Sequence, residues 1–195
     1  MGKIVMSEFV SLDGVVEDPA GSEGTPFGGW VGVVGGSKES DRIKLAEVEG
    51  ADALLLGRRT YAAFAARWPS RSGVMADRMN AMPKYVVSAT VDSPDWQNST
   101  VLTGDVVKAA AALRDEVAGD IVVYGSFRLT RTLLAHDLVD ELRLMVYPVV
   151  LGAGARLFGE TRKTVRLTHT QTVDDGITYL VYEPVRDGHA GEGPA

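Results

Sequence analysis

Two segments of the sequence have the residue types of a phosphate-binding site. Each is a short apolar run that suits a buried strand, followed by a glycine and then by a polar residue at the start of a predicted helix. The segments are Leu54-Leu55-Leu56-Gly57-Arg58 and Val122-Val123-Tyr124-Gly125-Ser126. A helix N-terminus offers free N–H groups and a positive dipole end, and glycine lets the backbone approach an anion closely. Two such junctions in one sheet suit a pyrophosphate; alternatively, both glycines simply make tight turns.

The first junction also carries two cations. Arg58 and Arg59 follow Gly57 directly, and Thr60 adds a hydroxyl group. A guanidinium matches a phosphate dianion in charge and in fork geometry. The usual nucleotide fingerprints are missing, since no stretch fits G-x-G-x-x-G and Gly2-Lys3 is the only Gly-Lys pair, which leaves no Walker loop. A dinucleotide at these junctions would therefore be bound by another scheme.

The composition is that of an ordinary globular protein and excludes several classes of function. The chain has 195 residues, 45% of them hydrophobic and 24% charged, and its net charge of −6 argues against a nucleic-acid or anionic-membrane surface. The absence of cysteine excludes disulfides, thiolate nucleophiles and cysteine-based metal sites, and three scattered histidines do not suggest a metal cluster. Without a membrane-spanning run or a signal-peptide pattern, we expect a cytoplasmic protein that acts on a small molecule.

Strand and helix patterns alternate through the middle of the chain. We predict strands at Lys3–Val10, Ala53–Leu56, Lys84–Ser88, Thr100–Leu102, Ile121–Tyr124, Glu141–Val150, Val165–Val173 and Thr178–Pro184. We predict helices at Ser37–Glu49, Thr60–Ala66, Val74–Met82, Asp105–Val117 and Phe127–Ala135. This order indicates an α/β fold, a three-layer sandwich whose central sheet is mostly parallel. Asp174-Asp175-Gly176 predicts an antiparallel C-terminal hairpin.

The chain shows no internal repeat or linker, so we predict one domain, residues 1–185, and a disordered tail, residues 186–195, that is rich in glycine, proline and charge. Asp18–Gly36 is a long glycine-rich loop that also contains Phe27 and Trp30. Such a loop is either functional and folded over a site, or a mobile surface loop with a hydrophobic anchor.

Six motifs, taken in their order along the chain, give the sequence a resemblance to a known family. Three resemble dihydrofolate reductase: Gly57-Arg58-Arg59-Thr60, Pro83-Lys84-Tyr85-Val86-Val87-Ser88 and Gly125-Ser126. Three resemble more closely the reductase (C-terminal) domain of the bifunctional riboflavin-biosynthesis deaminase–reductase: Ser11-Leu12-Asp13-Gly14, Leu138-Val139-Asp140-Glu141-Leu142 and Pro148-Val149-Val150-Leu151-Gly152-Ala153-Gly154. The match runs from about Lys3 to Glu183, and it implies a dihydrofolate-reductase-like fold.

The resemblance also implies NADPH as the cofactor. It assigns the cofactor phosphates to Gly57, Arg58, Arg59 and Thr60, with Arg58 as the partner of the adenosine 2′-phosphate. It places Ser88 and Thr90 on the adenosine side of the cofactor. It places Gly125, Ser126 and Leu129 on the pyrophosphate and nicotinamide side.

For the substrate half of the site, the resemblance implies Asp13 as the catalytic residue and as a substrate contact. Taken alone, Asp13 is better explained as a turn residue before a glycine. Trp30 and the pair Leu151-Gly152 complete the implied substrate pocket. Dihydrofolate reductase carries a carboxylate on the helix after its first long loop, and Asp41 sits near that position without a supporting motif.

The implied activity is that of the riboflavin reductase domain, a 5-amino-6-(5-phosphoribosylamino)uracil reductase-like hydride transfer to a C=N or C=O bond. The substrate would be a pyrimidine, a pterin-like compound or a small carbonyl compound. The resemblance further implies a homodimer. The alternatives are a non-catalytic nucleotide- or drug-binding protein on the same fold and a dihydrofolate reductase. We expect no zinc deaminase site in this sequence, unlike in the deaminase half of the riboflavin enzyme, since that site requires cysteine.

Overall fold

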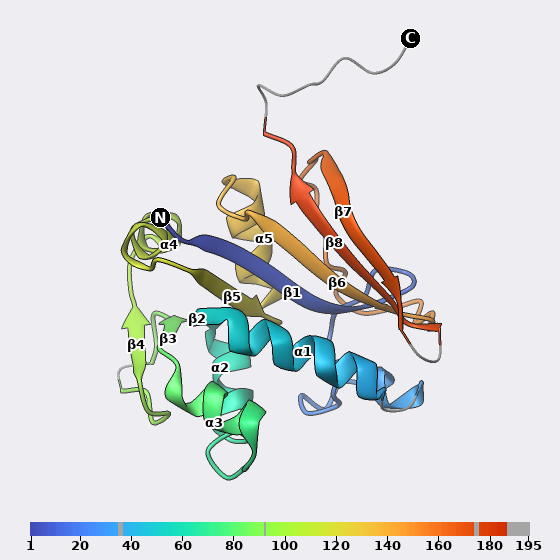
Figure 1. Cartoon of the computed structure of the whole chain (residues 1–195), viewed down its shortest axis with the longest axis horizontal. Coiled ribbons are helices and arrows are strands. Elements are labelled where there is room, and N and C mark those ends of the chain that lie inside the picture. Colours follow the sequence, from blue (N-terminus) through green and yellow to red (C-terminus); the bar gives the residue numbers. More distant parts are fainter. Residues whose placement is uncertain (35–36, 92, 174–175, 187–195) are drawn as a thin grey trace.

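The structure, a computed structural model, describes residues 1–34, 37–91, 93–173 and 176–186. One eight-stranded sheet forms its centre, in the order β4-β3-β2-β5-β1-β6-β8-β7 (Figure 1). The strands are β1 (Lys3–Ser11), β2 (Ala51–Gly57), β3 (Lys84–Val87), β4 (Ser99–Leu102), β5 (Asp120–Tyr124), β6 (Glu141–Tyr147), β7 (Val165–Thr172) and β8 (Thr178–Pro184). In this order, all neighbouring strands from β4 through β3, β2, β5 and β1 to β6 pair in parallel, whereas β8 is antiparallel to both β6 and β7. The mostly parallel sheet with an antiparallel C-terminal edge is confirmed.

Helices lie in the connections between consecutive parallel strands, except in the β3–β4 connection, where the described residues form none. The helices are α1 (Lys38–Gly50), α2 (Arg58–Ala65), α3 (Val74–Ala81), α4 (Val106–Glu116), α5 (Phe127–Ala135) and the short 3-10 helix η1 (Trp30–Val33). Two of them begin with a side-chain cap: the Ser37 hydroxyl accepts from Ser40 N at the start of α1, and the Asp105 carboxylate accepts from Val107 N at the start of α4. Neither α2 nor α5 has such a cap.

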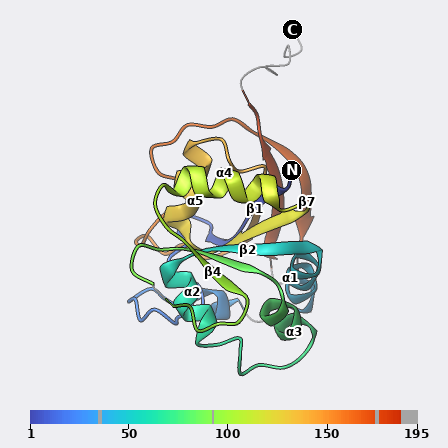
Figure 2. The same cartoon turned by 90° about the vertical axis from the view of Figure 1, so that its left-hand side faces the viewer.

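Helices cover both faces of the sheet, which gives three layers. Ile4 and Met6 of β1 pack in the core under α4 and α5, whereas Val5 packs in the core under α1, α2 and α3. Figure 2 shows α4 and α5 on one side of the strands and α1, α2 and α3 on the other. The central strands are buried on both faces, so they read as continuous apolar runs. This burial explains why Ala53–Leu56 and Ile121–Tyr124 are recognisable in the sequence.

Differences from the predicted elements are small and have local causes. Strand β6 ends at Tyr147 and not at Val150, because Pro148 has no N–H to donate to the sheet. The predicted loop 18–36 contains η1, and residues 35–36 lie outside the described part of the chain. The same holds for Asp174 and Asp175 of the hairpin turn and for residues 187–195 of the predicted tail. Arg186, the first residue of that tail, pairs with Asp140 at 2.6 Å.

A difference in strand length opens the sheet at one point. Strand β5 pairs with β1 only as far as Ser7, which lies opposite Tyr124, whereas β1 continues along β6 to Ser11. Beyond Tyr124, the second half of β1 therefore has no β5 neighbour. Ligands of parallel α/β sheets collect beyond the carboxyl ends of the strands, and here the short β5 leaves space for one.

Candidate functional site

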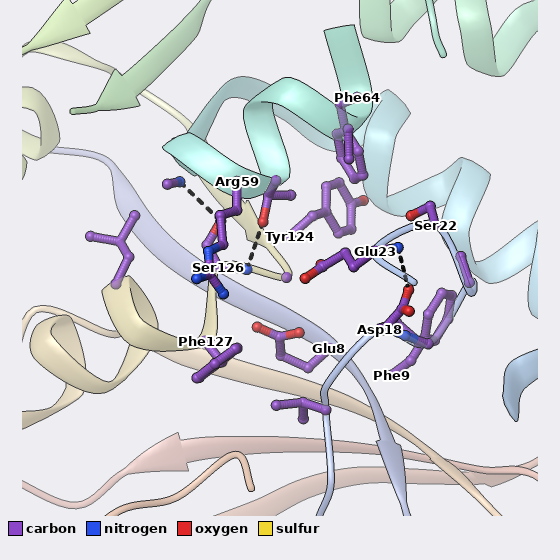
Figure 3. A pocket seen from close by; sticks show the side chains of 18 of the residues that line it. Glu8, Phe9, Asp18, Ser22, Glu23, Arg59, Phe64, Tyr124, Ser126 and Phe127 are labelled. Atoms are coloured by element: carbon purple, nitrogen blue, oxygen red, sulfur yellow. Dashed lines mark hydrogen bonds between the residues drawn. The ribbon is translucent and has the colours of Figure 1, made fainter. Parts of the chain in front are cut away.

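A cavity of about 430 Å³ lies at the carboxyl ends of β2 and β5 and beside residues 7–9 of β1. Its lining comes from residues 7–9 of β1, the start of α2, the β5–α5 junction and Lys44 of α1. The segment from Val16 to Glu23 supplies a further wall. Figure 3 shows the labelled side chains from these elements turned toward one space.

The two strand–glycine–helix junctions lie side by side in the cavity wall and are hydrogen-bonded to each other. The Ser126 hydroxyl accepts from Gly57 N at 2.9 Å, and the Thr60 hydroxyl accepts from Ser126 N at 3.0 Å. Gly125 has a φ of 54°, and a Cβ atom there would lie 3.3 Å from the Thr60 hydroxyl oxygen. Both the backbone conformation and the limited space therefore favour glycine at this position.

Both junctions present open helix N-termini to the cavity. Gly57 and Ser126 are the N-cap positions of α2 and α5, and neither N-terminus receives a side-chain cap from the residues that the structure describes. The cavity is lined by residues 57–60 and 125–129. Free N–H groups, two positive dipole ends and adjacent cations fit a bound pyrophosphate. The donor set thus suits the dinucleotide cofactor that the resemblance implies.

Arg58 lies between this cavity and a second pocket. The second pocket, of about 370 Å³, is lined by Arg58 together with Ser88, Thr90 and Gly104. The Ser88 hydroxyl accepts from Thr90 N and shapes the turn after β3. The structure therefore brings the predicted adenosine-side residues together with Arg58. Arg59, Thr60 and Leu129 lie in the wall of the larger cavity.

Asp13 lies elsewhere. Its carboxylate accepts hydrogen bonds from the Ser11 hydroxyl at 2.7 Å, Leu151 N at 3.2 Å and Gly152 N at 2.9 Å. These bonds, the one from Ser11 first, lower the pKa of Asp13 to about 2. An acid with this pKa carries no proton near neutral pH. Asp13 thus holds the turn at Leu151-Gly152 against the end of β1, and these three residues do not line the cavity.

Two other predicted residues are also outside the cavity lining. Trp30 is buried; its indole N–H donates to the Glu17 carbonyl at 2.9 Å, and its ring packs edge-on against Tyr147. This indole anchors η1 and the preceding loop to the sheet. Asp41 is exposed in the first turn of α1. The structure does not bring either residue to the junctions at Gly57 and Gly125.

Glu8, which the sequence reasoning missed, lies in the cavity lining. Its side chain belongs to the part of β1 beyond the end of β5, and the residue is only 4% exposed. Burial raises the pKa of Glu8 well above its usual value, against opposing effects from Lys44 and from a hydrogen bond with Thr130. A signal was present: Glu8 is the one acidic residue of the predicted strand Lys3–Val10. Figure 3 shows its carboxyl group turned toward the space between Phe127 and the segment from Val16 to Glu23.

A buried hydrogen-bond network backs the cavity next to Glu8. The Glu47 carboxylate accepts from the Ser7 hydroxyl at 2.8 Å, Lys44 Nζ at 3.0 Å, the Tyr179 hydroxyl at 3.1 Å and the Tyr124 hydroxyl at 3.3 Å. Burial, followed by the Glu47 charge, raises the pKa of Tyr124 well above its usual value. The Glu47 carboxylate compensates the Lys44 charge, and the network fixes Tyr124 in the cavity wall.

Comparison with known proteins identifies the family of this chain. A family model described as the RibD C-terminal domain matches residues 2–179. The chain belongs to this family. The uncharacterized protein YyaP of Bacillus subtilis (strain 168) is 28% identical over 138 residues, which cover 67% of this chain and 73% of YyaP.

Solved structures show that this RibD C-terminal domain protein has a dihydrofolate-reductase-like fold. A protein named for riboflavin biosynthesis from Shewanella sp. PV-4 superposes with a TM-score of 0.74 at 23% identity, over 94% of this chain and 99% of its own. Dihydrofolate reductase from Enterococcus faecalis, complexed with NADP(H) and RAB-propyl, superposes with a TM-score of 0.60 at 15% identity, over 93% of this chain and 96% of its own. The resemblance drawn from the six motifs is confirmed. Among the described residues, no helix is long and apolar enough to cross a membrane.

Proposed function

We propose that this RibD C-terminal domain protein is an NADPH-dependent reductase of the riboflavin reductase-domain type. The observation that carries the proposal is the pair of hydrogen-bonded junctions with open helix N-termini. Gly57 N donates to the Ser126 hydroxyl, and Ser126 N donates to the Thr60 hydroxyl. Family membership and the fold support the same activity.

The cofactor half of the site divides between the two pockets. Residues 57–60 and 125–129 would hold the pyrophosphate on the open N-termini of α2 and α5. Arg58 would bind the adenosine 2′-phosphate, with Ser88 and Thr90 beside the adenosine. Leu129 would pack on the nicotinamide side. NADPH, when bound, supplies the hydride that reduces a C=N or C=O bond.

The chain itself would orient the reactants and exclude water. The segment from Val16 to Glu23 covers part of the cavity, and the Asp18 carboxylate shapes it by accepting from Glu23 N at 2.9 Å and Thr25 N at 3.1 Å. This ordered segment supports the functional alternative for the predicted loop 18–36. Orientation and a dry site account for much of the protein's share in a hydride transfer.

The test is a fluorescence titration with NADPH and NADH. Micromolar binding of NADPH by the wild type supports the proposal, and failure of both cofactors to bind at that level would end it. Arg58→Ala should weaken NADPH by about 1.5–3 kcal/mol, roughly 10- to 150-fold, and should weaken NADH much less. Arg166→Ala, on the exposed strand β7, is the matched control and should change neither affinity. Equal losses for NADPH and NADH would show that Arg58 does not bind the 2′-phosphate.

The same titration separates the alternatives. A protein that binds NADPH but never oxidises it with pyrimidine, pterin or small carbonyl compounds would be the non-catalytic binding protein. The exposed position of Asp41 offers the dihydrofolate reductase alternative no carboxylate in the cavity at that place.

A further inference from the structure

The geometry points to Glu8 as the catalytic acid that gives a proton to the substrate, and to a planar ring with a reducible C=N bond as that substrate. This assignment rests on the proposed NADPH-dependent reduction. Glu8 takes the catalytic role expected of Asp13, whose carboxylate accepts hydrogen bonds from Leu151 N and Gly152 N.

Glu8 is buried in the wall of the cavity. The residue is 4% exposed, yet it contributes to the cavity lining beside the two cofactor junctions. Its Oε1 atom is buried and has no hydrogen-bond partner among the residues that the structure describes. A buried polar atom without a partner costs free energy, so such atoms are rare and call for an explanation. A ligand group in the cavity would complete the hydrogen bonding of this atom.

Charged side chains share the cavity lining with Glu8. The titratable side chains that line the same cavity are Asp18, Glu23, Lys44, Arg58, Arg59, Arg67, Tyr124 and Arg128. Lys44 is the charge that most favours ionisation of Glu8, but its Nζ atom donates to the Glu47 carboxylate and to the Ser7 hydroxyl at 2.6 Å. Burial outweighs this attraction and raises the pKa of Glu8, which favours the protonated carboxyl group that an acid requires.

The walls of the cavity indicate the shape of the substrate. Phe9, Phe64, Trp68 and Phe127 line it from three different segments of the chain. Aromatic walls beside the Glu8 carboxyl group suit a flat ring with a basic position. An imine-type nitrogen meets both demands, because it accepts the carboxyl proton and its carbon accepts a hydride.

The step balances as follows. The carbon of the C=N bond receives the hydride that NADPH supplies, and the nitrogen receives the proton of the Glu8 carboxyl group. A C–H and an N–H bond form, the C=N double bond becomes a single bond, and NADPH is oxidised to NADP⁺. The Glu8 carboxylate then regains a proton from water.

The experiment compares wild type with Glu8→Gln and Glu8→Asp. Glu8→Gln keeps the size of the side chain and removes the acid, and Glu49→Gln, at the exposed end of α1, is the matched control. Each protein is titrated with NADPH and then assayed for NADPH oxidation with 7,8-dihydropterin, 7,8-dihydrobiopterin and 3,4-dihydroisoquinoline. Infrared difference spectra at neutral pH record the carboxylic-acid C=O stretch of the NADPH complex.

We expect all four proteins to bind NADPH within about twofold of each other. We expect Glu8→Gln to lose about 100-fold or more in kcat, with Glu8→Asp retaining part of it and Glu49→Gln all of it. The wild-type kcat should fall as pH rises through the raised Glu8 pKa, and this fall should be missing in Glu8→Gln. A carboxylic-acid stretch present in wild type and missing in Glu8→Gln would show that Glu8 is the protonated group.

The remaining outcomes overturn the assignment separately from the proposed function. Failure of wild type to bind NADPH would reject the proposed function itself. Normal NADPH binding with an ionised Glu8, or with undiminished turnover in Glu8→Gln, would reject Glu8 as the acid. Normal NADPH binding without binding or turnover of any of the three C=N probes would reject the substrate class.

Discussion

Thr60→Val should loosen the junction between the two halves of the candidate cofactor site. The substitution exchanges a hydroxyl for a methyl group of the same size, so packing against Gly125 is preserved. What is lost is the acceptor that Ser126 N uses at 3.0 Å. An N–H group left without a partner costs about 1–3 kcal/mol. Because Thr60 and Ser126 are only half-buried, water replaces part of this bond, and we expect about 1–2 kcal/mol.

Urea unfolding measures this loss directly. With a slope of about 3 kcal/mol per molar, a loss of 1–2 kcal/mol lowers the midpoint by about 0.3–0.7 M. Thr60→Ser is the control, since it keeps the acceptor oxygen and removes one partly exposed methyl group, and it should lose less. Equal destabilisation by Thr60→Ser and Thr60→Val, or none by Thr60→Val, would refute the reasoning.

Two variants of Ser126 should differ in stability because of its backbone conformation. Its φ of 57° lies in the left-handed region, which costs a residue with a Cβ about 1–2 kcal/mol. Both Ser126→Ala and Ser126→Gly remove the acceptor used by Gly57 N, but only glycine also relieves the backbone conformation. Ser126→Gly should therefore be the more stable variant by about 1 kcal/mol, and the reverse order in urea would contradict the assigned conformation.

Three further predictions concern buried or bonded charges. Burial raises the pKa of Glu8 in the folded protein above the unfolded value of about 4.3. The contribution of Glu8 to the free energy of unfolding is therefore complete below about pH 4.3 and is lost as pH rises through the folded pKa. In urea unfolding, wild type should lose stability relative to Glu8→Gln between pH 5 and pH 9. The pKa of Asp13 is lowered to about 2, so its contribution is present above about 3.9 and lost as pH falls toward the folded value; the stability gap between wild type and Asp13→Asn should narrow from pH 6 to pH 3, and a constant gap would contradict this. Lys84 is fully buried and donates to the carbonyls of Met79, Asn80 and Met82, so Lys84→Met should cost about 3 kcal/mol in urea unfolding, and an unchanged midpoint would show that these bonds contribute nothing.

Local patterns were enough to predict most of the fold. The bounds of α5 and β8 agree with the predicted Phe127–Ala135 and Thr178–Pro184 to the residue, because Ser126 and Pro184 are clear local boundaries. Continuous apolar runs also indicated the strands that are buried on both faces. Their order in the sheet depends on pairings between distant segments, and the parallel part of the sheet followed from the alternation of strands and helices.

The candidate site was only partly predictable, for a physical reason. The junctions at Gly57 and Gly125 carry local signals, and the structure places them together. Glu8 acquires its environment only because β5 ends opposite Ser7, which no local pattern reveals. Asp13 is the converse case, since its alternative interpretation as a turn residue agrees with its bonds to Leu151 and Gly152. The homodimer, the cofactor and the substrate stay predictions.

The central position of β1 has a consequence for biosynthesis. Ile4, Val5 and Met6 are fully buried between β5 and β6, yet both neighbouring strands lie more than 100 residues later in the chain. At 5–20 residues per second, a ribosome needs roughly 5–30 s to deliver them after β1. The most apolar part of the first strand is therefore exposed for most of translation, and the Gly57 junction is made long before its partner at Gly125. Nascent chains that end before β5 should consequently need chaperones most. A cofactor can stabilise the chain only after the Gly125 junction has emerged.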